Sequence, residues 1–206
     1  KLNMKNRTNV RWLTQLALLV AILLVVNYTP LGYLQVGPLS ASLLSVPVAI
    51  GAMTMGPLAG TILGAAFGIT SFLQAMEGKS LLSAAMFNAS PVGTFVVCVV
   101  SRVLVGLCTA LLFKALCKLL PKQEKICCFA GGLLTAVLNT VFFMGALVLL
   151  FYDLPYVQEL AQGMGATNVL MFVVMFVGVQ AVIEWVICCL VSGAVTVPVR
   201  RYLKLN

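Results

Sequence analysis

Long apolar runs, separated by short polar or Pro- and Gly-containing segments, make up most of the chain. A helix needs about 20 mostly apolar residues to cross the roughly 30 Å hydrocarbon core of a bilayer. Six runs predict such helices, at residues 12–28, 41–55, 58–75, 94–120, 126–152 and 168–197. The second is short, and only Gly56-Pro57 separates it from the third. The pattern predicts an all-α integral membrane protein in which residues 1–206 form a single transmembrane domain of six helices.

The first run follows Lys5, Arg7 and Arg11, as the apolar part of a signal peptide would. The run is long for that part, and residues 27–30, which follow it, do not form a small-x-small cleavage site. We therefore expect the first run to be a retained span.

Composition supports a membrane location. Hydrophobic residues make up 62% of the chain and charged residues 9%, whereas soluble domains contain about 25% charged residues. Most of the basic residues flank the spans on one side, at Lys1, Lys5, Arg7, Arg11, Lys114, Lys118, Lys122, Lys125, Arg200, Arg201 and Lys204. By the positive-inside rule, both termini are predicted to be cytoplasmic. Basic residues that flank spans, instead of sharing one face, argue against a nucleic-acid surface.

Several kinds of chemistry have little support in the sequence. Histidine is absent, and none of the seven cysteines forms a C-x-x-C pair, so we expect neither a metal site nor catalytic residues. The chain has no G-x-x-x-x-G-K-[ST] motif. If transport is driven by ATP, another polypeptide hydrolyses the nucleotide, and this chain needs no cofactor of its own.

Two charged side chains, Arg102 and Glu184, lie within the predicted spans. An ionisable group inside the membrane is costly and normally faces the interior of the bundle with a partner. The two residues could form a structural ion pair with each other. Alternatively, Arg102 binds an anionic ligand, because a guanidinium offers a planar fork that matches a carboxylate.

Uncharged polar residues are the other candidates for a binding site. Asn139 and Thr140 interrupt the fifth span toward its predicted outer half, and Gln74 and Gln180 lie in other spans. Each side chain could join helices by hydrogen bonds or contact a ligand. Asn88, in the predicted outer loop between the third and fourth spans, completes the set of candidate substrate-binding residues.

Small residues recur at four-residue spacing in two spans. Ala17 and Ala21 would lie on one face of the first helix, where a partner protein in the membrane could approach closely. Gly60, Gly64 and Gly68 form a longer stripe in the third span, for which internal helix packing is the favoured explanation.

The ordered motifs resemble the substrate-binding S components of energy-coupling factor (ECF) vitamin transporters. The resemblance covers nearly the whole chain, and its closest likeness is to the pantothenate-type branch. It is carried by Thr29-Pro30-Leu31-Gly32-Tyr33-Leu34, Gly37-Pro38, the segment 46–52, Gly56-Pro57-Leu58-Ala59-Gly60, the segment 64–71, Ser101-Arg102-Val103-Leu104-Val105-Gly106, Leu138-Asn139-Thr140-Val141, Glu184 and Val197-Pro198-Val199-Arg200.

The resemblance implies a six-helix subunit of an ECF-type ABC importer in the bacterial plasma membrane. Such a subunit captures a vitamin or precursor, here best matched by pantothenate, and delivers it inward with a transmembrane coupling subunit and two cytoplasmic ATPases. Ala17 and Ala21 match the family's docking motif for the coupling subunit. Three alternatives stay open: an S component for another vitamin such as folate, riboflavin or cobalamin, a stand-alone transporter or other membrane protein, and an intramembrane enzyme using Glu184.

Overall fold

The computed structural model describes residues 4–29, 33–36 and 39–203. Its helices are α1 (Met4–Tyr28), α2 (Ser45–Met55), α3 (Pro57–Met76), α4 (Leu81–Ala89), α5 (Pro91–Phe95), α6 (Ser101–Leu119), α7 (Glu124–Phe151), α8 (Pro155–Gly163) and α9 (Val169–Leu203). The π-helix η2 (Val96–Val100) joins α5 to α6 in one continuous rod. Strands β1 (Tyr33–Val36) and β2 (Leu39–Ser42) pair antiparallel, so the fold is helical apart from one hairpin.

Five helical segments of the described chain are long and apolar enough to cross a membrane. They are Val10–Tyr28, Pro57–Met76, Pro91–Leu119, Glu124–Phe151 and Gln180–Tyr202. These segments correspond to five of the six predicted spans, with boundaries that differ by a few residues except at the start of the last segment. That segment belongs to α9, which begins at Val169.

The predicted second span, residues 41–55, is wrong in its first part. Residues 41 and 42 belong to β2, and the helix begins only at Ser45. Eleven helical residues extend about 16 Å, roughly half the hydrocarbon thickness. Residues 41 and 42 are therefore not part of the helix, and pairing with β1 satisfies their backbone groups.

A tight turn reverses the chain between α2 and α3. Gly56 has a φ of 91°, a backbone conformation that residues with a Cβ rarely adopt. Pro57 then begins α3, where its missing N–H costs no helical hydrogen bond. The short Gly-Pro connection expected from the sequence is therefore confirmed, and it places α2 directly beside α3.

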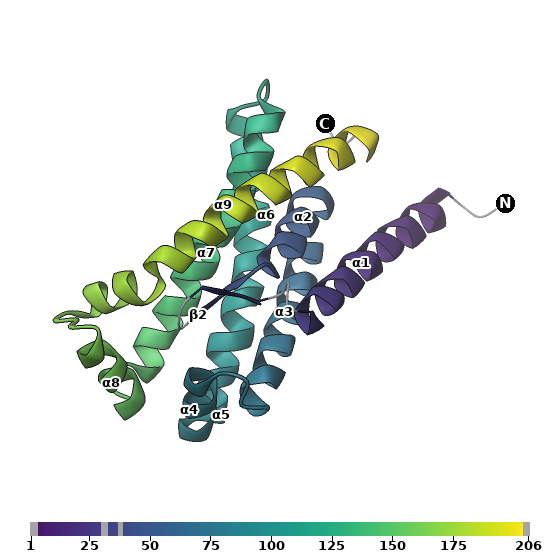
Figure 1. Ribbon diagram of the computed structural model, residues 1–206. Helices are drawn as coiled ribbons and strands as arrows, with labels where there is room; N and C mark the ends of the chain where they lie inside the picture. The colour runs from purple at the N-terminus through teal and green to yellow at the C-terminus, as the bar shows by residue number, and fades with distance from the viewer. Residues whose placement is uncertain (1–3, 30–32, 37–38, 204–206) are drawn as a thin grey trace.

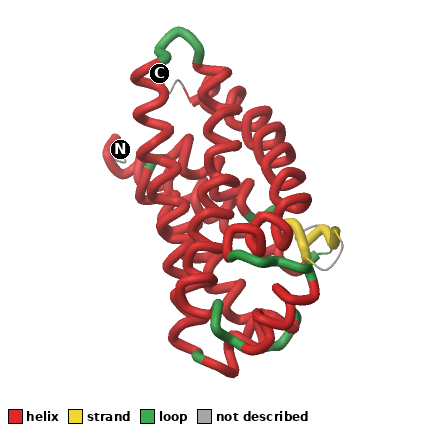
Figure 2. Tube along the Cα trace, turned by 90° about the vertical axis from the view of Figure 1, so that its left-hand side faces the viewer, coloured by secondary structure: helices red, strands yellow, loops and turns green. Residues whose placement is uncertain are grey.

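The long helices form a bundle with different elements at its two ends. Figure 1 shows the chain ends and the α6–α7 turn toward the upper end, and α4, α5 and α8 at the lower end. Helix α9 crosses the bundle obliquely and packs along α7, while α3 packs along α6. Figure 2, from the side, shows the hairpin at the edge of the bundle between its two ends.

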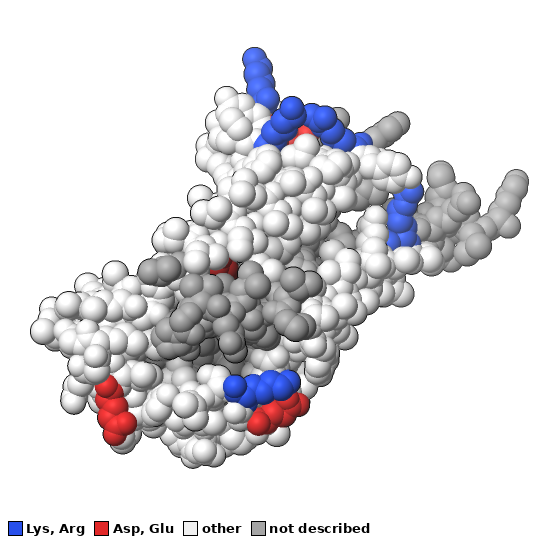
Figure 3. Space-filling view, viewed as in Figure 1, with Lys and Arg blue, Asp and Glu red and all other residues white. Residues whose placement is uncertain are grey.

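Charged side chains separate between these two ends. Figure 3 shows most of the visible Lys and Arg at the end that holds the α6–α7 turn and the ends of the described chain, and most of the visible Asp and Glu at the other end, where Lys79 pairs with Glu77. Within the basic end, Arg200 Nε lies 2.9 Å from Glu124 Oε1, and Arg200 donates a hydrogen bond to the Met53 carbonyl at 3.0 Å. The basic end therefore ties α2, α7 and α9 together.

Candidate functional site

A cavity of about 500 Å³ lies between the long helices in the half of the bundle that carries α4. Its walls come from the ends of α1 and α3, from α4, from the α5–η2–α6 rod, and from α7 and α9. The volume falls within the roughly 300–1,000 Å³ of typical small-molecule sites. Six of the predicted site residues line it: Gln74, Arg102, Asn139, Thr140, Gln180 and Glu184.

Arg102 is 9% exposed and is held by its own helix. Its Nη1 donates to the carbonyls of Cys98 at 3.0 Å and Val97 at 3.3 Å. Both carbonyls belong to η2, in which the Ser101 N–H bonds to the carbonyl five residues back, at Val96. The wider π turn makes carbonyls accessible to side chains, and the Ser101 hydroxyl also donates to Val97.

Two aromatic rings flank the guanidinium of Arg102. Its Cζ lies 4.5 Å from the ring centre of Phe67 on α3 and 4.9 Å from that of Phe143 on α7. Cation–π contacts stabilise a cation that has lost its water. Arg102 Nε is buried and donates no hydrogen bond within the part of the chain that the structure describes. A cation whose Nε has no partner in the described chain therefore lies beside the cavity.

Glu184 does not form an ion pair with Arg102 in the described chain. Its Oε1 instead accepts hydrogen bonds from Asn139 Nδ2 at 3.1 Å and from Ser45 Oγ at 3.2 Å. Glu184 is 5% exposed and Asn139 8%. The bonds connect α2, α7 and α9, and they replace the structural ion pair that the sequence allowed.

Thr140 and Gln74 join helices while also lining the cavity. Trp185 Nε1 on α9 donates to Thr140 Oγ1 at 3.3 Å, and Gln74 Nε2 donates to Asn27 Oδ1 on α1 at 3.0 Å. Interhelical bonding was one of the two roles that the sequence allowed for each of these side chains. Both residues remain available to a ligand, because each also lines the cavity.

Asn88 lies apart from the other candidates. It is exposed on α4, and the residues lining the cavity do not include it. The α4 residues that do face the cavity are Leu82, Ser83 and Met86. Asn88 follows Met86 by two residues on α4 and so lies on another face of this helix, which the sequence analysis had treated as a loop.

Several residues of the site had no clear signal in the sequence. Phe67 and Phe143 look like ordinary apolar residues of their spans, and Ser45 lies in the run that was predicted as the second span. Lys79, which lines the cavity and pairs with Glu77 at 2.8 Å, lies in the predicted outer loop. The rings of Phe67 and Phe143 contact the guanidinium only because the fold brings α3 and α7 close to Arg102.

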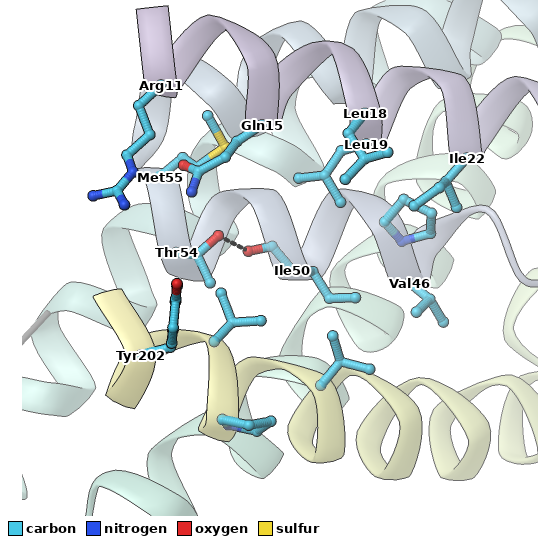
Figure 4. A pocket seen from close by; sticks show the side chains of 14 residues that line it. Arg11, Gln15, Leu18, Leu19, Ile22, Val46, Ile50, Thr54, Met55 and Tyr202 are labelled. Carbon is cyan, nitrogen blue, oxygen red and sulfur yellow. Dashed lines mark hydrogen bonds between the residues drawn. The ribbon is translucent and has the colours of Figure 1, made fainter. Parts of the chain in front are cut away.

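A second hollow, about 670 Å³, runs between α1, α2 and α9. Figure 4 shows Leu18, Leu19 and Ile22 of α1 facing Val46 and Ile50 of α2, with Arg11 and Tyr202 at one end. The Thr54 hydroxyl is already bonded to the Ile50 carbonyl at 2.6 Å. Apart from Arg11, Gln15, Thr54 and Tyr202 toward one end, the described lining is apolar, so most of this hollow, which we call the α1 groove, offers few hydrogen bonds to a polar metabolite.

Ala17 and Ala21 are exposed on α1 and are not among the residues that line the α1 groove. Of the five candidate spans, the one in α1 has the smallest buried share. The two alanines therefore lie on a helix face that the rest of the described chain leaves open.

A family model described as "ECF transporter, substrate-specific component" matches residues 11–195. A search of curated proteins found no match for this chain.

Proposed function

Because the chain belongs to the family of substrate-specific components of ECF transporters, we propose that it captures a small anionic vitamin or precursor in the cavity beside Arg102. Members of this family are multi-pass subunits of the cell membrane that bind substrate without catalysis. The observation that carries this proposal is the buried Arg102 Nε, a cationic donor lining the cavity without a partner in the described chain.

The chemistry of the cavity favours a carboxylate that also carries polar groups. Arg102 supplies a fixed positive charge, and Asn139, Thr140 and Gln180 add neutral polar groups. A ligand that leaves water needs replacements for its lost hydrogen bonds. An apolar or cationic vitamin would leave the Arg102 charge uncompensated, whereas a carboxylate accepts a charge-assisted bond from it.

Pantothenate is the ligand that we propose first. It is a small carboxylate with two hydroxyls and an amide, so it offers a partner to the guanidinium and to the neutral side chains. The resemblance of the sequence to the pantothenate-type branch points to the same ligand. Folate, riboflavin and cobalamin are the alternatives within the same family.

Delivery across the membrane requires other subunits in this proposal. A transmembrane coupling subunit would dock on the Ala17–Ala21 face of α1, and two cytoplasmic ATPases would hydrolyse ATP. Both termini would be cytoplasmic and the cavity would load from outside. The exposure of the two alanines supports the docking part of the proposal.

A thermal-shift screen of the purified chain against B vitamins and their precursors tests the ligand. A ligand that binds only the folded state stabilises it by mass action, by about 2.7 kcal/mol at a concentration one hundred times Kd. We expect pantothenate to give the largest shift. A larger shift with another vitamin would reassign the substrate, and no shift with any of them would count against the proposal.

Reconstitution in vesicles separates a capture subunit from a stand-alone transporter. The chain alone should bind labelled pantothenate without accumulating it. Accumulation should require the coupling subunit, both ATPases and ATP. Accumulation by the chain alone, driven by an ion gradient, would favour the stand-alone transporter instead.

A further inference from the structure

Asn139, Glu184 and Ser45 form a hydrogen-bonded cluster beside the cavity. Asn139 Nδ2 and Ser45 Oγ both donate to the same oxygen, Glu184 Oε1, at 3.1 and 3.2 Å. The three residues come from α7, α9 and α2, and each of the three side chains is more than nine-tenths buried. The cluster belongs to the interior of the bundle, and two of its members line the cavity.

The direction of the Asn139 amide follows from its partner. An amide group carries a donor end and an acceptor end, and a carboxylate oxygen can only accept. The nitrogen of Asn139 must therefore face Glu184. Its Oδ1 is buried and accepts no hydrogen bond within residues 4–29, 33–36 and 39–203.

A buried acceptor without a donor is costly. Two residues that line the cavity thus carry complementary orphans, the buried Nε donor of Arg102 and the buried Oδ1 acceptor of Asn139, and Ser71 Oγ is another buried lining atom without a partner in the described chain. A bare carboxylate or a fatty acid would satisfy the first orphan and leave the second. A ligand that also brings a hydroxyl or an amide N–H would satisfy both.

We propose that Asn139 determines specificity by accepting a hydrogen bond from a hydroxyl or N–H of the ligand, and that Glu184 is the positioning residue that fixes the Asn139 amide. The ligand class is then a small carboxylate that carries such a donor. This inference rests on the proposed function, since it assumes that the cavity beside Arg102 holds the transported molecule.

The experiment measures the affinity of the full chain in detergent for four probes by calorimetry. The probes are pantothenate, its analogue without hydroxyls N-(3,3-dimethylbutanoyl)-β-alanine, pantothenate methylated at the amide nitrogen, and panthenol, which has an alcohol in place of the carboxylate. The wild-type chain should bind pantothenate at least tenfold more tightly than at least one of the two analogues that lack a donor, which are the analogue without hydroxyls and the N-methylated one.

Variants then assign that preference to residues. Asn139→Ala and Glu184→Met should each reduce the preference to less than threefold, while the preference for pantothenate over panthenol, which depends on Arg102, persists. Glu184→Gln keeps an acceptor oxygen for Asn139 and Ser45, so it should retain most of the donor preference. Thr109→Val, a substitution at a buried α6 residue outside the cavity lining, serves as the control for changes in the interior.

The outcomes distinguish the two levels of the argument. Equal loss of affinity for all four probes in Asn139→Ala and Glu184→Met would mean a merely structural role and would overturn the inference alone. An unchanged donor preference in these variants would do the same. Failure of the wild-type chain to bind any probe, or equal binding of pantothenate and panthenol, would overturn the proposed ligand class and this inference with it.

Discussion

Arg102 is tolerated inside the bundle because the protein itself supplies most of its surroundings. Carbonyls of η2 accept from one end of the guanidinium, and the rings of Phe67 and Phe143 flank it. A carboxylate partner inside the protein is thus unnecessary, and Glu184 is bonded elsewhere. Within the described chain the guanidinium is therefore held in place without an internal ion pair.

Replacing Arg102 should weaken ligand binding more than it weakens folding. We expect Arg102→Ala to reduce pantothenate affinity by about 1.5–3 kcal/mol, the value of a hydrogen bond to a charged group, which is on the order of 10- to 150-fold in Kd. The affinity of Arg102→Lys should fall between those of the wild-type chain and Arg102→Ala, because lysine keeps the charge but lacks the planar fork. Calorimetry would measure these changes.

The control for this prediction is Arg201→Ala, at an exposed position of the basic end. It removes one positive charge without touching the cavity, so its affinity should equal that of the wild-type chain. Unchanged affinity in both Arg102 variants would remove this residue from the site.

The contact between α3 and α6 depends on glycine. A Cβ built at Gly64 would clash with the carbonyl oxygen of Arg102 and would lie 3.0 Å from its carbonyl carbon. At Gly60 and Gly106 such an atom would meet the backbone of the facing helix. The glycine stripe expected to serve internal packing is confirmed in that role, and it sets the position of the helix that carries Arg102.

Gly64→Ala should therefore destabilise the protein by about 1–3 kcal/mol, as overpacking usually does. It should also lower pantothenate affinity, because α6 must move away from α3 and takes Arg102 with it. Thermal unfolding in detergent and calorimetry measure the two effects. Gly145→Ala is the matched control, since a Cβ there meets nothing within 4 Å. Equal stability of both variants would contradict the packing argument.

Helix α1 offers a different kind of surface. Ala17 and Ala21 are exposed, and small residues at this spacing permit close approach of another membrane helix. We expect the double substitution Ala17→Leu and Ala21→Leu to leave pantothenate affinity unchanged but to abolish co-purification with the coupling subunit. Ala115→Leu, at an exposed alanine of α6, should change neither the pantothenate affinity nor the co-purification. An undiminished complex in the double variant would rule out this docking face.

The distribution of charge over the whole molecule predicts its orientation. The two ends of the described chain and the α6–α7 turn lie toward one end of the bundle, where Lys and Arg gather. The positive-inside rule assigns that end to the cytoplasm.

Protease accessibility in intact cells measures this orientation. Tags at either terminus should resist protease added outside, whereas a tag inserted at Gly165, in the turn after α8 at the opposite end, should be cleaved. Cleavage of both terminal tags with protection of the inserted tag would invert the topology.

The sequence alone was sufficient for properties that depend on transfer from water to lipid. Apolar runs of sufficient length located the five long spans, because burying a helix of that length in hydrocarbon is favourable whatever surrounds it. The isolated charge of Arg102 and the amide of Asn139 marked the candidate site, since such groups are costly in an apolar span, and both residues line the cavity.

Tertiary structure decided which of these polar groups meet. Whether Arg102 pairs with Glu184 depends on how α6, α7 and α9 rotate and cross, and side-chain packing, not hydropathy, sets those angles. Features that hydropathy did not predict are the contact of Phe67 and Phe143 with the guanidinium and the position of Asn88 away from the cavity. The start of α2 at Ser45 is another. Hydropathy acts on each residue by itself, whereas a binding site is made by distances between residues remote in sequence, and only the folded chain fixes those distances.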